Sequence, residues 1–181
     1  MRQYRPARPR LDINAIGAAG EILAIVAPGF RAGDLHAATG KAQQDGYAVR
    51  IASTADSLVE GEGDKGDTLS FVVDAKPADS DPAEFAGLVI PGGDRHIDTL
   101  AADAGVERLV RSFVESGKPV LGWREGAQLL ASFSPAPDTV RNADVAMALN
   151  GEVYPTESEE GRDDAAILFR QALELKPEKV A

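Results

Sequence analysis

Short apolar runs alternate with helical patterns along this chain. Ile22–Ala27 and Tyr47–Ser53 are rich in β-branched residues, which predicts two buried strands. Between them, apolar residues three or four positions apart predict a helix, which we expect Asp34 to cap and Gly46 to end. Strands that alternate with helices favour parallel pairing through right-handed crossovers, with the sheet covered on both faces.

The second half of the chain continues the same alternation. Apolar positions between Val106 and Val114 follow the spacing of an amphipathic helix. Asn150-Gly151 between two apolar segments predicts a tight hairpin, and 165–173 predicts a closing helix. Three further predicted strands are Leu69–Val73, Leu88–Ile90 and Val120–Gly122. The pattern as a whole therefore predicts an α/β domain with a mostly parallel sheet and a small β-hairpin.

Three polar or glycine-rich segments come directly after predicted strands. They are Pro28–Asp34, Pro91–His96 and Trp123–Gly126. In open parallel sheets, ligands bind beyond the carboxyl ends of the strands, where such segments meet. Candidate functional residues are therefore sought at this edge.

Length and charge limit the classes of function. With 181 residues, the chain suits one domain, and we divide it into an arm (1–20), a domain (21–176) and a tail (177–181). The net charge of −10 argues against binding to nucleic acid or to an anionic membrane, although the arm itself carries four arginines. No apolar run approaches the ~20 residues of a membrane span.

The chain contains no cysteine. Disulfides, zinc–thiolate sites and thiol nucleophiles are therefore excluded, and a reducing, cytoplasmic compartment is favoured. The acidic loop Gly61–Asp67 does not match the ligand spacing of a calcium site. We expect neither a metal nor a cofactor.

Two segments carry a family resemblance. Phe85–Gly93 (FAGLVIPGG) and Ser116–Ser132 (SGKPVLGWREGAQLLAS) resemble the ThiJ/PfpI (DJ-one-like) superfamily, which is related to class I glutamine amidotransferases. The first strand–helix–strand unit is similar as well. The resemblance implies a flavodoxin-like three-layer sandwich and a cysteine-dependent hydrolase, deglycase or glyoxalase-like activity.

The residues that would carry that activity are replaced. The family's turn Ala-Ile-Cys-His-Gly-Pro-Gln-Leu-Leu aligns with 122–130, so Arg124 stands at the cysteine position and Glu125 at that of the neighbouring histidine. Arg31 stands where PfpI-type members place a supporting glutamate. A guanidinium stays protonated and offers no lone pair for attack, so we predict a degenerate site without the family activity.

Two arginines in one cleft need compensating charge. The resemblance implies that Gly92, Gly93 and the amide after the turn would surround the cleft. One hypothesis is an anion-binding pocket built from these amides with both arginines. The alternative, which we favour, is an internal ion-pair cluster of Arg31 and Arg124 with Glu125 and Asp34 that fills the cleft. The full set of candidate ligand-binding residues is Arg31, Asp34, Gly92, Gly93, His96, Arg124, Glu125 and Gly126.

The resulting prediction is a non-catalytic, homodimeric protein that acts in binding or stress protection, with a small anionic metabolite as the candidate ligand. Degenerate domains of this fold at the C-terminus of large-subunit catalases offer an analogy for a structural role. The alternative is a cysteine-independent hydrolase or lyase with Glu125 or His96 as general base and Arg31 and Arg124 as a clamp. A flavodoxin or phosphoacceptor receiver is disfavoured, because 27–34 lacks both a phosphate loop and an acidic pair.

Overall fold

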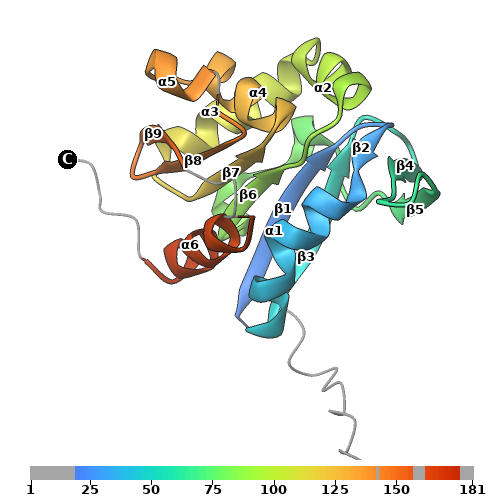
Figure 1. Cartoon of the computed structure of the whole chain (residues 1–181), viewed down its shortest axis with the longest axis horizontal. Helices are drawn as coiled ribbons and strands as arrows, with labels where there is room; N and C mark the ends of the chain where they lie inside the picture. The colour runs from blue at the N-terminus through green and yellow to red at the C-terminus, as the bar shows by residue number, and fades with distance from the viewer. Residues whose placement is uncertain (1–18, 142, 157–161, 176–181) are drawn as a thin grey trace, which may run out of the picture.

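The computed structural model describes residues 19–141, 143–156 and 162–175 (Figure 1). Most of the predicted arm and the whole predicted tail lie outside these ranges. A six-stranded sheet in the order β3-β1-β6-β7-β8-β9 forms the centre of the molecule. Its strands are β1 (Gly20–Val26), β3 (Tyr47–Ser53), β6 (Gly87–Ile90), β7 (Val120–Trp123), β8 (Val145–Leu149) and β9 (Glu152–Pro155).

The four strands β3, β1, β6 and β7 pair in parallel, and β8 and β9 add an antiparallel edge. Residues 22–26 of β1 are fully buried, because helices cover both faces of this part of the sheet. The order of the strands reverses at β1, which is flanked by β3 and β6. This is the switch point at which α/β sheets open a crevice beyond their carboxyl ends.

Helices cover the two faces of the sheet and complete the predicted three-layer α/β sandwich (Figure 1). α1 (Ala32–Gln44) and α6 (Arg162–Glu174) pack on one face, around a core that includes Phe30, Trp123 and Phe169. The other face carries α2 (Asp94–Ala101), α3 (Ala104–Glu115), α4 (Glu125–Phe133) and α5 (Asp138–Arg141). The predicted fold class is confirmed.

A second, three-stranded sheet stands beside the main one. It contains β2 (Phe30–Arg31), β4 (Leu58–Glu62) and β5 (Thr68–Val72) in the order β2-β4-β5. β4 and β5 form an antiparallel hairpin whose connection is the acidic glycine-rich loop. The sequence predicted β5 but not β4, whose Glu-Gly-Glu end breaks the apolar pattern of a strand.

Two local predictions are corrected by the structure. Asp34 does not cap α1: the cap is Arg31, and Asp34 lies within the first helical turn, where its side chain is 3% exposed. The helix α2 was not predicted, because four of its eight residues are charged or Thr and only His96 and Leu100 are buried. The Asn150-Gly151 hairpin is confirmed, with positive φ angles of 53° and 84° at its two turn residues.

Small 3-10 turns precede β6, at Pro77–Asp79 and Pro82–Glu84. Lys118 holds this region in place, since its ammonium donates to the carbonyls of Pro82 and Phe85. In the part of the chain that the structure describes, no helix has the length and hydropathy needed to cross a bilayer.

Candidate functional site

The turn between β7 and α4, residues 122–126, has the geometry of a strained elbow. Arg124 has φ 52° and ψ −117°, an unusual conformation for a residue that carries a side chain. Glycine is required on both sides: a Cβ at Gly126 would lie 2.1 Å from the carbonyl oxygen of Ile90, and one at Gly122 would lie 2.6 Å from that of Gly126. The close packing of backbone on backbone holds Arg124 in its strained conformation.

The loops after β1 and β6 lie against each other at the same edge of the sheet. The Arg31 amide donates to the carbonyl oxygen of Gly92 at 2.9 Å. A Cβ on Gly93, which has φ 129°, would lie 2.6 Å from the carbonyl oxygen of Gly29. The elbow joins these two loops through Glu125, whose carboxylate accepts from the Gly93 amide, so the three predicted segments meet at one edge of the sheet.

Two carboxylates of the chain itself accept hydrogen bonds from the amides of the Gly92-Gly93 turn. The Gly92 amide donates to Asp34 Oδ2 at 3.2 Å, and the Gly93 amide donates to Glu125 Oε2 at 2.8 Å. These are the donors that an external anion would need. In this conformation they are already satisfied by internal negative charge.

Both arginines of the cleft lie close to these carboxylates. Arg124 Nε is 3.6 Å from Asp34 Oδ2, and the guanidinium side chain is 41% exposed whereas the carboxylate is 3% exposed. Arg31 is exposed and lines the rim of the cleft, where its charge acts on Glu125. The nearly buried Asp34 carboxylate therefore has both a backbone donor and a cation, which offset the cost of its burial.

The surroundings of Glu125 lower its pKa. Desolvation alone would raise the pKa of this carboxyl. Hydrogen bonds from the Gly93 amide and from its own amide, the side chain of Asp94 and the charge of Arg31 together outweigh desolvation. Glu125 is thus held as a carboxylate and is a weak acceptor of protons near neutral pH.

His96 lies beneath the cleft rather than in it. Its side chain is fully buried, Nδ1 accepts from the Ala27 amide at 2.9 Å, and Nε2 lies 3.0 Å from the carbonyl oxygen of Pro91. These partners require the neutral ring with the proton on Nε2. Burial lowers the pKa of His96 to about 4, against the weaker opposing effects of Pro91 and Glu125. The imidazole joins the ends of β1 and β6.

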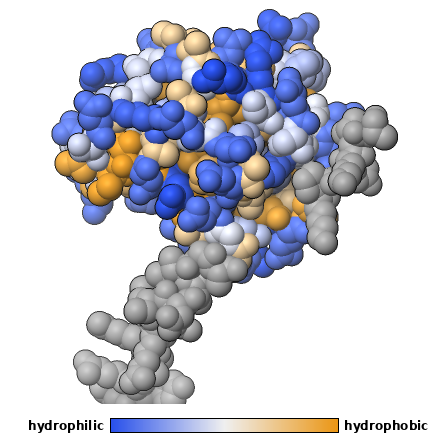
Figure 2. Space-filling view, turned by 180° about the vertical axis from the view of Figure 1, so that it is seen from behind, coloured by the Kyte–Doolittle hydropathy of each residue, from blue (hydrophilic) through white to orange (hydrophobic). Residues whose placement is uncertain are grey.

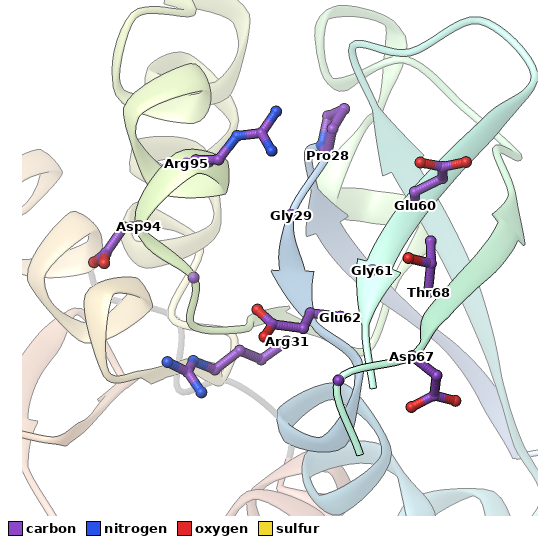
Figure 3. A pocket seen from close by; sticks show the side chains of 12 residues that line it. Pro28, Gly29, Arg31, Glu60, Gly61, Glu62, Asp67, Thr68, Asp94 and Arg95 are labelled. Atoms are coloured by element: carbon purple, nitrogen blue, oxygen red, sulfur yellow. The ribbon is translucent and has the colours of Figure 1, made fainter. Parts of the chain in front are cut away.

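A pocket of about 450 Å³ opens between α2 and the β4–β5 hairpin, and Pro28, Gly29 and Arg31 also line it (Figure 3). Arg95 projects from α2 on one side, and Glu60 and Thr68 lie on the hairpin side (Figure 3). A smaller pocket of about 140 Å³ adjoins it and shares Arg31 and Glu62 with it. Carboxylates outnumber arginines among the lining residues, so the wall is acidic rather than basic.

The predicted candidates thus fall into two groups. The structure brings Arg31, Asp34, Arg124 and Glu125 together around the Gly92-Gly93 turn. His96 and Gly126 are buried parts of the scaffold instead.

Other residues at the cleft were missed. Asp94 directly follows the Gly92-Gly93 turn, so its position after a strand was a usable signal. Glu60 and Glu62 line the pocket from β4, the strand of the hairpin that the sequence pattern did not predict. Among the described residues, no group of three or more His, Asp or Glu side chains is arranged to hold a metal ion.

Comparison with known proteins agrees with this geometry. A family model described as DJ-1/PfpI matches residues 20–138. Protein/nucleic acid deglycase 2 of Escherichia coli (strain K12) is 38% identical over 84 residues, which cover 46% of either chain. Protein DJ-1 homolog D of Arabidopsis thaliana is 41% identical over 71 residues, which cover 39% of this chain and 17% of that protein. The matches therefore span less than half the length of these relatives.

Solved structures share the fold at low sequence identity. A ThiJ/PfpI domain protein from Brachyspira murdochii superposes with a TM-score of 0.67 at 17% identity, over 86% of this chain and 96% of that one. The oxidised DJ-1 of Toxoplasma gondii gives a TM-score of 0.61 at 15% identity, over 85% and 94% of the two chains.

The backbone contact at Gly126 gives a prediction about stability. Gly126→Ala forces a Cβ against the Ile90 carbonyl, and we expect it to lower the free energy of unfolding by more than ~3 kcal/mol or to prevent folding. Gly40→Ala is the matched control, since no atom lies within 4 Å of its added Cβ and helix propensity favours alanine by about 1 kcal/mol. Urea unfolding measures both variants, and equal stabilities would contradict the elbow packing.

The buried neutral His96 gives a pH dependence. Its folded pKa of about 4 lies below the ordinary 6.5, so the unfolded chain binds more protons between these values. The stability contributed by the neutral ring is complete above pH ~6.5 and declines as the pH falls toward 4, by roughly 3 kcal/mol in total. Unfolding free energies measured from pH 7.5 to 4.5 should lose this slope in His96→Gln and keep it in His36→Gln. Identical slopes in the two variants would refute the assignment.

Proposed function

The chain belongs to the DJ-1/PfpI family, and we propose that it is a non-catalytic member whose former nucleophile cleft is filled by its own ion pairs. It retains the fold and the elbow of the family, and it acts through binding rather than through turnover. The absence of cysteine from the whole sequence supports this proposal. The thiol chemistry that the resemblance implies has no atom to carry it.

The residue at the elbow supports the same conclusion. The strained turn presents Arg124 to the cleft, and a guanidinium has no usable lone pair at neutral pH. Its nearest opposite charge is Asp34, from the first turn of α1. The strained turn thus positions Arg124 for its ion pair with Asp34.

The observation that carries the proposal is the occupation of the Gly92 and Gly93 amides by Asp34 and Glu125. An incoming carboxylate or phosphate would have to displace both side chains and would meet their negative charge. This favours a filled cleft over the anion-binding alternative, in which the same amides and the two arginines would bind a small anionic metabolite.

The cysteine-independent enzyme is less well supported. The lowered pKa of Glu125 makes this carboxylate a poor general base, and the partners of His96 occupy both of its nitrogens. The deglycase name belongs to a relative that this chain matches over less than half of its length. A stress-protective role, a homodimer and a cytoplasmic location stay predictions of the family resemblance.

Removing the internal carboxylates tests the filled cleft. We expect phosphate or citrate to leave the melting temperature of the unaltered protein unchanged. In Asp34→Asn/Glu125→Gln, the cleft keeps Arg31 and Arg124 but loses two negative charges, so phosphate should stabilise it. Stabilisation at one hundred times the dissociation constant would amount to about 2.7 kcal/mol.

The control for this experiment is Glu84→Gln/Glu115→Gln, which removes the same charge from exposed positions away from the cleft. Thermal-shift titration of the three proteins measures the effect. If the unaltered protein is stabilised as strongly as the cleft variant, the anion-binding alternative replaces the filled cleft.

A second test restores sulfur to the elbow. We expect Arg124→Cys to lack measurable esterase or glyoxalase activity, because Arg31 supplies no supporting carboxyl and the nearby Asp34 and Glu125 disfavour a thiolate. The new thiol is the only one in the chain, so its alkylation rate against pH reports its pKa directly. Ser132→Cys, on the exposed side of α4, is the reference thiol. Robust turnover by Arg124→Cys would show that the cleft is still competent.

A further inference from the structure

The end of the β4–β5 hairpin packs on the first turn of α1. We call residues 63–67, which connect the two strands, the hairpin tip. A Cβ built on Gly33 would lie 2.9 Å from Asp64 Cγ and closer still to Oδ1, so the carboxylate of Asp64 covers the bare backbone of this glycine. Any larger residue at position 33 would force the carboxylate to move.

The polar contacts of the hairpin tip are internal. The Gly63 amide donates to the carbonyl oxygen of Asp67 at 2.8 Å, and the Gly66 amide donates to that of Gly63 at 3.0 Å. Within the described ranges, the side chain of Asp64 forms no hydrogen bond and no ion pair. Its contact with α1 is therefore one of packing and of long-range charge, without a directional bond.

Apolar packing does not fix the hairpin tip either. The exposed apolar residues of the hairpin, Leu58 and Val72, form a cross-strand pair at its other end. Apolar surface gathers on this side of the molecule in the space-filling view from behind (Figure 2). The contact of Asp64 with Gly33 therefore ties a polar, glycine-rich tip to α1.

The charge of α1 favours a carboxylate at this position. No side chain caps the first amides of the helix, so they keep their partial positive charge. The guanidinium of Arg31 lines the same small pocket as Asp64, whereas the Asp34 carboxylate in the first turn opposes the attraction. Because Asp64 is exposed, the net attraction is weak and is screened by salt. A contact of this kind opens and closes readily.

The hairpin tip lies over a nearly buried charge of the cleft. The pocket of about 140 Å³ has Arg31 and Asp34 on one side and residues 62–64 and 66 of the hairpin on the other. Asp34 is 3% exposed and pairs with Arg124. We propose that the hairpin tip is a flap, held closed by Asp64 on Gly33, and that its opening admits water and ions to the Asp34–Arg124 pair.

Such a flap regulates the filled cleft, and its role in the protein rests on that proposed function. The opening itself does not, because it depends only on the contact between the hairpin tip and α1. Access of water to Asp34 can therefore be measured separately from the binding of phosphate.

Amide hydrogen exchange in the unaltered protein and in glycine variants tests the flap. The Gly92 amide donates to Asp34 Oδ2, so its exchange rate reports how often water reaches this carboxylate. Gly33→Ala keeps the charge of Asp64 but places a methyl group where its carboxylate lies, so the side chain must move aside. We expect exchange at Gly92 to become about tenfold faster in this variant.

Gly40→Ala is the matched control, because it lies in the same helix and its added Cβ meets no atom within 4 Å. There the rate at Gly92 should not change, and the amide of Ala24 in β1 reports any change in global stability. Asp64→Ala removes the same contact from the other side, so combining it with Gly33→Ala should give no faster exchange than the faster single variant. Equal rates at Gly92 in the two glycine variants overturn the proposal.

A disulfide can hold the flap closed, since the chain has no native thiol. In Gly33→Cys/Asp64→Cys the new side chains replace groups already in contact, and we expect diamide to join them. Exchange at Gly92 should then be about tenfold slower in the oxidised form than in the reduced form of the same variant. In Gly40→Cys/Asp64→Cys, the first thiol lies two turns further along α1, about 10 Å away, and should stay reduced.

Two outcomes of the disulfide experiment overturn the flap: failure of the first pair to cross-link, and equal exchange in its oxidised and reduced forms. Neither depends on the phosphate titration. If the flap opens as expected but phosphate does not stabilise Asp34→Asn/Glu125→Gln, the filled cleft is refuted and the flap is retained.

Discussion

The contact between the Gly126 backbone and the carbonyl of Ile90 is the constraint on which the cleft depends. It brings the start of α4 against the end of β6, and this approach forces the chain through the positive φ of Arg124. Once the elbow is formed, Glu125 in the first turn of α4 faces the Gly92-Gly93 turn. The positions of Arg124 and Glu125 follow from a steric requirement for glycine, rather than from the charges themselves.

On this backbone, each charged group or backbone donor of the cleft lies near a group of opposite charge. The arginine at the elbow is exposed, whereas its partner, an aspartate from α1, is nearly buried. The ion pair therefore stabilises the aspartate more, because its carboxylate has lost its contact with water. The amides of the Gly92-Gly93 turn would otherwise point unpaired into the cleft, and each receives one carboxylate. A site whose donors are satisfied from within has little remaining affinity for a second anion. This is the physical basis for proposing a filled cleft rather than an anion-binding one.

Much of this arrangement could be predicted from the sequence, because β-branched runs and glycine turns report local structure directly. The strands from 22 to 27 and from 47 to 53 and the meeting of three loops at one edge were predicted, and so was the family. Asp34 was expected both to cap α1 and to pair with the arginines; the pair with Arg124 is present, but the cap is not. A carboxylate near a helix start signals a cap equally well when it points inward to the sheet. His96 was placed in the cleft because it follows the glycine turn, yet burial depends on the helical phase of α2, which a weak apolar pattern does not reveal. The hairpin wall of the pocket pairs β5 with β4, whose Glu-Gly-Glu end breaks the apolar pattern by which a strand is predicted.

The presence of an arginine rather than a thiol at the elbow also determines how the cleft responds to peroxide. A low-pKa thiol can pass through sulfenic, sulfinic and sulfonic acid, and each step alters its charge and its shape. The Arg124–Asp34 pair has no such states, so its charge and hydrogen bonds stay the same in an oxidising burst. The charge of this pair therefore responds to protons, salt or a competing ion rather than to peroxide.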